Sequence, residues 1–238
     1  MPDEARDRLI VALDVGSLDQ AKAFVERLDG LVAFFKVGIE LQLAEGMPPV
    51  RYLTSVGKKA FLDLKYFDVP QTVGRAVHQA AGLGVNFLTI HGNARNIEAA
   101  VRGRGNADLK LLAVTVLTSL DADDIRELGF ECPVEELVLH RARKALEAGC
   151  DGVIASGREA KQIRALLGPK LLVVTPGIRP AGFAEQDQKR AVTPREAILA
   201  GADYLVVGRY ITTDSDPRAA AERVIVEMRD AFAERARA

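Results

Sequence analysis

Charged residues of alternating sign stand close together in the first third of the sequence. Asp63 and Lys65 are two positions apart, so on a β-strand their side chains project from the same face, and Asp68 follows three residues later. Lys36 lies in the preceding apolar segment and would be their neighbour if the two segments form adjacent strands. Such an array is costly to bury without a purpose. The four residues are therefore candidates for catalysis, and a purely structural salt-bridge network is the alternative.

Two later segments each combine glycine with arginine. Gly177 precedes Arg179 by two positions, and Gly208 directly precedes Arg209. Glycine lets backbone N–H groups approach an anion closely, and arginine can donate two hydrogen bonds to phosphate oxygens. The paired placement predicts a phosphate site, with two ordinary turns as the alternative.

Eight apolar segments alternate with segments of helical periodicity, and together they must position these side chains. The apolar segments are continuous, which is typical of parallel strands covered on both faces. Eight such units in 238 residues predict a (βα)8 TIM barrel forming a single domain over residues 1–238, with a doubly wound open sheet as the alternative. The strands are expected at 9–13, 34–38, 59–65, 86–91, 111–117, 152–156, 171–175 and 204–208. The helices with predicted bounds are 70–81, 96–101, 121–128, 133–148, 194–200 and 217–233.

A barrel of this kind carries its active site at the C-terminal ends of the strands, often with phosphate bound after strands seven and eight. We therefore expect one ring of side chains there, formed by Asp14, Lys36, Asp63, Lys65, His91, Thr115, Thr118, Gly177, Arg179, Gly208 and Arg209. Residues 177–193 form an unusually long and polar connection. We interpret this connection as a lid that closes over the ligand, with Gln188 as a hydrogen-bond donor to it. A surface insertion without such a role is the alternative.

The overall composition points away from several classes of protein. A formal net charge of −1 provides no general attraction to nucleic acid or to an anionic membrane. Cys132 and Cys150 do not suggest a disulfide framework and are interpreted as reduced thiols. The charged N-terminus lacks the apolar stretch of a signal peptide, and no apolar run is long enough to span a bilayer. The expected location is the cytoplasm.

The pattern Asp63-x-Lys65-x-x-Asp68-x-Pro70-x-Thr72 resembles the motif of orotidine 5'-monophosphate decarboxylases, and the bacterial-type form is the most similar. Matching segments extend over nearly the whole chain, at residues 13–15, 35–38, 115–119, 175–180, 187–190 and 207–209. The resemblance implies a carboxy-lyase that converts orotidine 5'-monophosphate to UMP, the last step of de novo pyrimidine synthesis. It also implies that the enzyme uses no cofactor and no metal.

The resemblance also implies individual roles. Lys65 would donate the proton to C6 of the pyrimidine, and Asp63 would lie beside the departing carboxylate. Asp68 and Thr72 would reach into the site of a second subunit, which makes a homodimer with shared sites; no nucleic-acid or membrane partner is implied. The remaining contacts to the nucleoside monophosphate would be Lys36 and Asp14 to the ribose, Thr118 to the pyrimidine, Gln188 to base and phosphate, and Arg179, Gly208 and Arg209 to the phosphate.

The implied chemistry agrees with the residue types. Loss of CO2 leaves a carbanion in the ring plane, which a cationic lysine can stabilise and then protonate. Neighbouring carboxylates favour a cationic lysine, which argues against a Schiff base. Asp63 would either repel the substrate carboxylate or position Lys65. Two alternative functions stay open: a magnesium-dependent sugar-phosphate decarboxylase or synthase of the same superfamily, and a catalytically silent phosphosugar-binding barrel.

Overall fold

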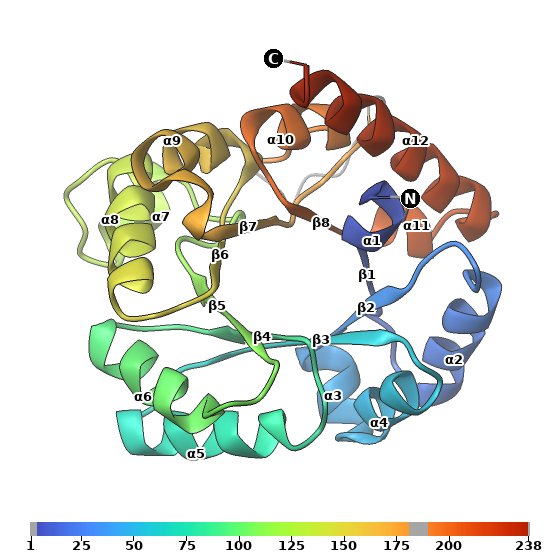
Figure 1. Cartoon of the computed structure of the whole chain (residues 1–238), viewed down its shortest axis with the longest axis horizontal. Helices are drawn as coiled ribbons and strands as arrows, with labels where there is room; N and C mark the ends of the chain where they lie inside the picture. Colours follow the sequence, from blue (N-terminus) through green and yellow to red (C-terminus); the bar gives the residue numbers. More distant parts are fainter. Residues whose placement is uncertain (1–3, 181–189, 238) are drawn as a thin grey trace.

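Eight parallel strands pair in chain order and close into a barrel in this computed structural model, which describes residues 4–180 and 190–237 (Figure 1). The closure joins β8 to β1, with Leu9 beside Leu205 and Val11 beside Val207. The predicted (βα)8 barrel is thus confirmed, and the open sheet is excluded. The strands are β1 (Leu9–Ala12), β2 (Phe34–Gly38), β3 (Lys59–Tyr66), β4 (Phe87–Ile90), β5 (Lys110–Val114), β6 (Gly152–Ile154), β7 (Leu172–Thr175) and β8 (Tyr204–Val207).

Helices surround the barrel and bury their apolar faces against the outside of the strands (Figure 1). Several begin with a side chain that caps the first turn, among them Asn93, Asp121 and Thr193. Around the barrel lie α2 (Leu18–Arg27), α3 (Ile39–Glu45), α4 (Pro48–Ser55), α5 (Pro70–Ala81), α6 (Ala94–Arg104), α7 (Ala122–Glu127), α8 (Val134–Glu147), α9 (Gly157–Leu167), α10 (Pro194–Ala200) and α12 (Pro217–Arg235). Three short elements were not expected from the sequence: α1 (Glu4–Arg8), the 3-10 turn η1 (Gly168–Lys170) and α11 (Arg209–Thr212).

The bounds of α5 and α10 agree with the prediction, whereas β5 ends at Val114, three residues before the predicted end. The chain leaves the sheet there and turns across the end of the barrel. Thr118, which follows this departure, lines the cavity at that end of the barrel.

Inside the barrel, alternate residues of each strand point to the axis and form layers. One layer is aromatic: the ring centroid of Phe87 lies 4.9 Å from that of Phe34, 5.9 Å from Phe61 and 5.0 Å from Tyr204, all in edge-to-face geometry. Two residues further along β2, β3 and β4, the same alternation places Lys36, Asp63 and Thr89. The polar site therefore stands directly on a packed apolar floor.

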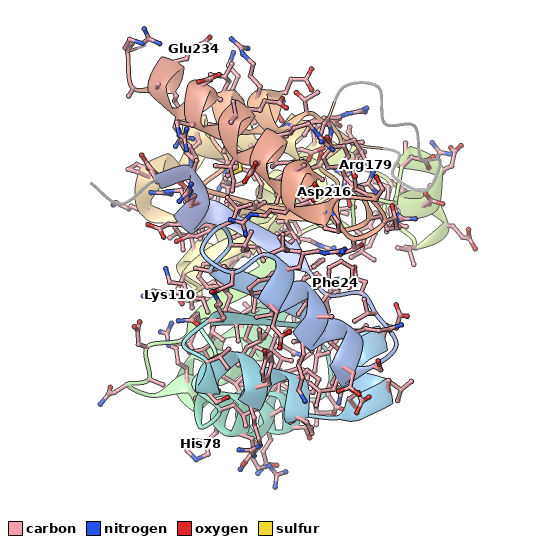
Figure 2. All side chains as sticks on the ribbon, turned by 90° about the vertical axis from the view of Figure 1, so that its right-hand side faces the viewer. Phe24, His78, Lys110, Arg179, Asp216 and Glu234 are labelled. Carbon is pink, nitrogen blue, oxygen red and sulfur yellow. The ribbon has the colours of Figure 1, made fainter. Side chains whose placement is uncertain are left out.

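The two ends of the barrel differ in their side chains. Figure 2 shows Lys110, at the start of β5, and Arg179, just after β7, at opposite ends of the barrel. The end with Arg179 is the C-terminal end of the strands, where the candidate residues were predicted. Within the described ranges, none of the helices is both long enough and apolar enough to cross a lipid bilayer.

Candidate active site

A cavity of about 260 Å³ opens at the C-terminal ends of the strands. Its floor is apolar and includes Ala12, Phe61, Ile154 and Val206. Predicted site residues form much of its polar wall: Asp14, Lys36, Asp63, Lys65, Thr118, Gly177, Arg179, Gly208 and Arg209. The barrel thus brings together, in one concave site, side chains that are as much as 195 positions apart in the sequence.

Asp63 lies between two lysines. Its Oδ1 is 2.9 Å from Nζ of Lys65, and its Oδ2 is 3.6 Å from Nζ of Lys36. The Lys36 ammonium also donates to Oδ1 of Asp14 at 2.9 Å. The side chains of Asp63 and Lys36 are only 13% and 10% exposed, whereas that of Lys65 is 31% exposed toward the cavity. These contacts form a continuous row of alternating charge in the order Asp14, Lys36, Asp63 and Lys65.

The electrostatics of Asp63 favour the carboxylate. Burial would raise its pKa, but the positive charges of Lys36 and Lys65, with hydrogen bonds from Lys65 and Thr89, hold the pKa below its ordinary value. The site consequently holds a fixed negative charge whose neighbours are both cations.

Asp63 and Lys65 were predicted to project from the same face of a regular strand. Their side chains do meet, but the strand is irregular at this point. Lys65 has φ of 51°, and among the described residues it is the only non-glycine residue with positive φ. The pairing of β3 with β4 shifts in register between Leu62 and Tyr66, so β3 bulges where it carries the charges.

Two glycines shape the site, and one of them was missed by the sequence reasoning. A Cβ on Gly38 would lie 3.0 Å from both Asp14 Oδ1 and Lys36 Nζ, so a larger residue would crowd this ion pair. Gly177 adopts φ of 73°, a conformation that glycine adopts without strain, and it leads the chain to Arg179. Gly38 lies at the end of an expected strand and within the matching segment 35–38, but no role in the site was predicted for it.

Asp68 and Thr72 do not line the cavity of their own chain, and both are exposed. The carboxylate of Asp68 accepts a hydrogen bond from the N–H of Val69 at 2.6 Å. The backbone carbonyl of Asp68 accepts another from Asn96 Nδ2, also at 2.6 Å. The flanking Phe67 and Val69 expose 68% and 63% of their surface. This segment is therefore exposed, and its backbone is hydrogen-bonded to Asn96.

Two residues expected in the ring are turned away from the cavity. The hydroxyl of Thr115 donates to the carbonyl of Ile154 at 2.7 Å and is buried. His91 is half-buried against Phe67, with ring centroids 5.5 Å apart, and burial followed by the charges of Arg141 and Lys65 lowers its pKa. Gln188 lies outside the described residues.

A buried ion pair, also missed by the sequence reasoning, braces the loop after β5. Arg190 Nη1 donates to Glu159 Oε1 at 2.7 Å, and its Nη2 donates to the carbonyls of Val116 and Leu117 at 2.9 Å each. Both side chains are nearly inaccessible, and burial raises the pKa of Glu159 against the attraction of Arg190. The pair holds the backbone directly before Thr118. In the sequence, Arg190 belongs to a polar stretch and gives no sign of being buried.

Comparisons with known proteins agree on one family. Residues 7–224 match the family model described as "Orotidine 5'-phosphate decarboxylase / HUMPS family". A protein of Nitrobacter winogradskyi named orotidine 5'-phosphate decarboxylase is 55% identical over 230 residues, 97% of this chain and 96% of the relative. One of Methylococcus capsulatus with the same name is 52% identical over 234 residues, 98% of this chain and 96% of the relative. The crystal structure of orotidine 5'-phosphate decarboxylase from Lactobacillus acidophilus is similar with a TM-score of 0.82 at 40% identity, covering 93% of this chain and 99% of that one.

Proposed function

The chain belongs to the orotidine 5'-phosphate decarboxylase / HUMPS family, and we propose that its charged array performs the decarboxylation of orotidine 5'-monophosphate to UMP and CO2. This reaction is a step of pyrimidine biosynthesis, and the relatives of this chain are named for it. The observation that carries the proposal is the placement of Asp63 between Lys36 and Lys65 in a cavity with an apolar floor. We also assign the enzyme to the cytoplasm, where pyrimidine nucleotides are made.

Lys65 is the proposed proton donor. When the bond between C6 and the carboxylate breaks, its electron pair stays on C6 in the ring plane. The Lys65 ammonium stabilises this charge and then transfers a proton to C6, which gives UMP. Lys65 exposes more surface than Lys36 toward the cavity, which suits the lysine that must reach the substrate.

Asp63 serves two purposes in this proposal. It lies beside the departing carboxylate, and its 2.9 Å contact with Lys65 Nζ supports the additional role of positioning the ammonium. Lys36 and Asp14, paired at 2.9 Å, hold the ribose, and Thr118 contacts the pyrimidine. Arg179, Gly208 and Arg209, which line the same cavity, bind the phosphate. Gln188 is proposed as a further donor to base and phosphate.

Asp68 and Thr72 complete the site of a second copy of the chain, so the working enzyme is a homodimer. Both residues are exposed and lie outside their own cavity. The neighbouring Phe67 and Val69 expose apolar surface of the kind that a subunit interface buries.

A turnover assay in the presence of EDTA tests the function. The purified protein is expected to release CO2 from orotidine 5'-monophosphate at the same rate with and without the chelator. Turnover of a pentulose or hexulose phosphate that EDTA abolishes would instead assign the chain to the magnesium-dependent members of the superfamily. Absence of both activities, with retained binding of UMP, would identify a binding protein.

A further inference from the structure

Thr89 is a buried polar residue that faces the bulge in β3. It lies at the centre of β4 with no exposed surface and does not line the cavity. On one side of it Leu62 pairs with Leu88, and on the other Tyr66 pairs with Ile90. Between these two pairings β3 advances four residues while β4 advances two, and Thr89 is the single β4 residue opposite Asp63, Leu64 and Lys65.

The hydroxyl of Thr89 forms two hydrogen bonds to the residues of the proposed reaction. It accepts one from the backbone N–H of Lys65 at 2.9 Å. It donates the other to Oδ1 of Asp63, also at 2.9 Å. One hydroxyl can accept and donate at the same time, so both bonds are satisfied together.

The first of these bonds explains how Lys65 keeps its backbone conformation. A lysine with φ of 51° is strained, because its Cβ approaches the backbone in the left-handed region. Strained residues persist where surrounding contacts determine their geometry. Because of the bulge, Lys65 has no register partner in β4. Its backbone N–H donates to the side-chain hydroxyl of Thr89.

The second bond fixes the carboxylate. Oδ1 of Asp63 accepts from both the Thr89 hydroxyl and Lys65 Nζ, while Oδ2 faces Lys36. The carboxylate is therefore held from three directions, and Lys65 is held at its backbone and at its side-chain end by one connected network.

We propose that Thr89 is a positioning residue for decarboxylation: its hydroxyl fixes the Lys65 backbone and the Asp63 carboxylate, and so sets where the Lys65 ammonium stands relative to the reacting carbon. The inference rests on the proposed roles of Lys65 and Asp63. Thr89 itself touches neither the cavity nor the reacting atoms.

The test compares Thr89→Val, which keeps the shape and removes the hydroxyl, with Thr89→Ser, which keeps the hydroxyl. Misplacement of a reacting group by about 1 Å can lower a rate about 100-fold. We expect kcat of Thr89→Val on orotidine 5'-monophosphate to fall roughly 100-fold, while the Kd for UMP changes by less than about threefold. Thr89→Ser should retain kcat within about threefold of wild type. Wild-type kcat in Thr89→Val, or equal impairment of the two variants, would overturn the proposal, as would a matching loss of UMP binding in Thr89→Val.

Thr115→Val is the matched control. Thr115 is also a buried threonine at the same end of the barrel, and its hydroxyl bonds to the Ile154 carbonyl and not to the charged array. Thr115→Val should keep wild-type kcat. If Thr115→Val lost as much kcat as Thr89→Val, the loss would follow from removing any buried threonine hydroxyl at this end of the barrel. Positioning by Thr89 would then be refuted.

Two further readouts separate positioning from bulk stability. Removing a donor to the carboxylate raises the pKa of Asp63, so the acidic limb of the kcat profile should move to higher pH in Thr89→Val and stay in place in Thr115→Val. A crystal structure of Thr89→Val should show Lys65 outside the positive-φ region or its Nζ displaced from Asp63. An unchanged Lys65 in this crystal structure would overturn the inference, whatever the activity of the wild-type protein. Failure of the wild-type protein to decarboxylate the substrate would instead refute the proposed function.

Discussion

At the scale of the residue, the charged array works because its members neutralise one another inside a poorly solvated site. A buried charge is tolerated when it is paired and hydrogen-bonded. Asp63 faces a cation on either side, and Lys36 faces an anion on either side. Lys65 differs from Lys36: it contacts one carboxylate, that of Asp63, and its side chain is more exposed where it lines the cavity. That asymmetry is the physical reason for assigning it the proton.

Lys65→Ala should lower kcat by at least about 10²–10⁴-fold, because it removes both the proton donor and the charge that stabilises the carbanion. The fold should persist, since the side chain is partly exposed and its loss leaves Asp63 paired with Lys36. Single-turnover CO2 release measures the effect, and thermal unfolding checks the fold. Lys59→Ala removes an exposed lysine from the opposite end of the same strand and should be as active as wild type. Near-normal turnover by Lys65→Ala would rule out the assignment.

Sequence reasoning identified the charged residues of the site but not the residues that hold them. Asp63, Lys65 and Lys36 stand out because charges are unexpected in apolar strands. Thr89 and Gly38 do not stand out, because a threonine in a strand and a glycine at its end are common. Their importance arises from a bulge and from a 3.0 Å approach to an ion pair, and both depend on packing between different strands.

At the scale of the element, hydrophobic patterning was enough to predict the eight strands and their order around the barrel. The ends of elements were less predictable, because they depend on tertiary contacts. β5 stops at Val114, and the chain beyond it is fixed by carbonyl contacts to Arg190, a residue 73 positions beyond Leu117. No local pattern in residues 111–117 encodes that partner.

The buried pair of Glu159 and Arg190 leads to a pH-dependent prediction. Arg190→Met leaves the Glu159 carboxyl buried without its cation, and burial already raises the pKa of this group. A carboxyl whose folded-state pKa is raised costs nothing below its unfolded pKa. Its cost grows as the pH rises from the unfolded pKa toward the folded pKa, because over that range only the unfolded state loses the proton. Arg190→Met should therefore lose more of its free energy of unfolding, relative to wild type, as pH rises from about 5 to about 8.

Urea unfolding at several pH values measures this loss, and Glu159→Gln is the matched control. A glutamine at this position does not titrate, and it leaves the buried arginine without its carboxylate, which costs about 3–5 kcal/mol. This penalty should not grow with rising pH. The double variant should cost less than the sum of the two single changes, because it leaves no unpaired charge. A penalty for Arg190→Met that is constant with pH would contradict the account.

At the scale of the whole molecule, the net charge of −1 conceals a strong local separation of charge. Arginines after β7 and β8 line a cavity that is also lined by the alternating lysine and aspartate side chains. Recognition of an anionic substrate is thus a property of one end of the barrel. The site is also incomplete within one chain under the proposed function, since Asp68 and Thr72 are exposed and do not line their own cavity.

Mixing two inactive variants tests whether sites are shared between subunits. Asp68→Ala should damage the partner's site, and Lys65→Ala the chain's own site. In a hybrid dimer of the two, one site combines both defects and the other is intact. Random exchange of equal amounts makes half of the dimers hybrid, so activity should recover to roughly a quarter of the wild-type value. Denaturation and joint refolding ensure the exchange, and native mass spectrometry of an isotope-labelled subunit counts the hybrids. If Asp68→Ala is inactive alone, hybrid dimers that form without recovered activity would show that Asp68 serves its own chain's site.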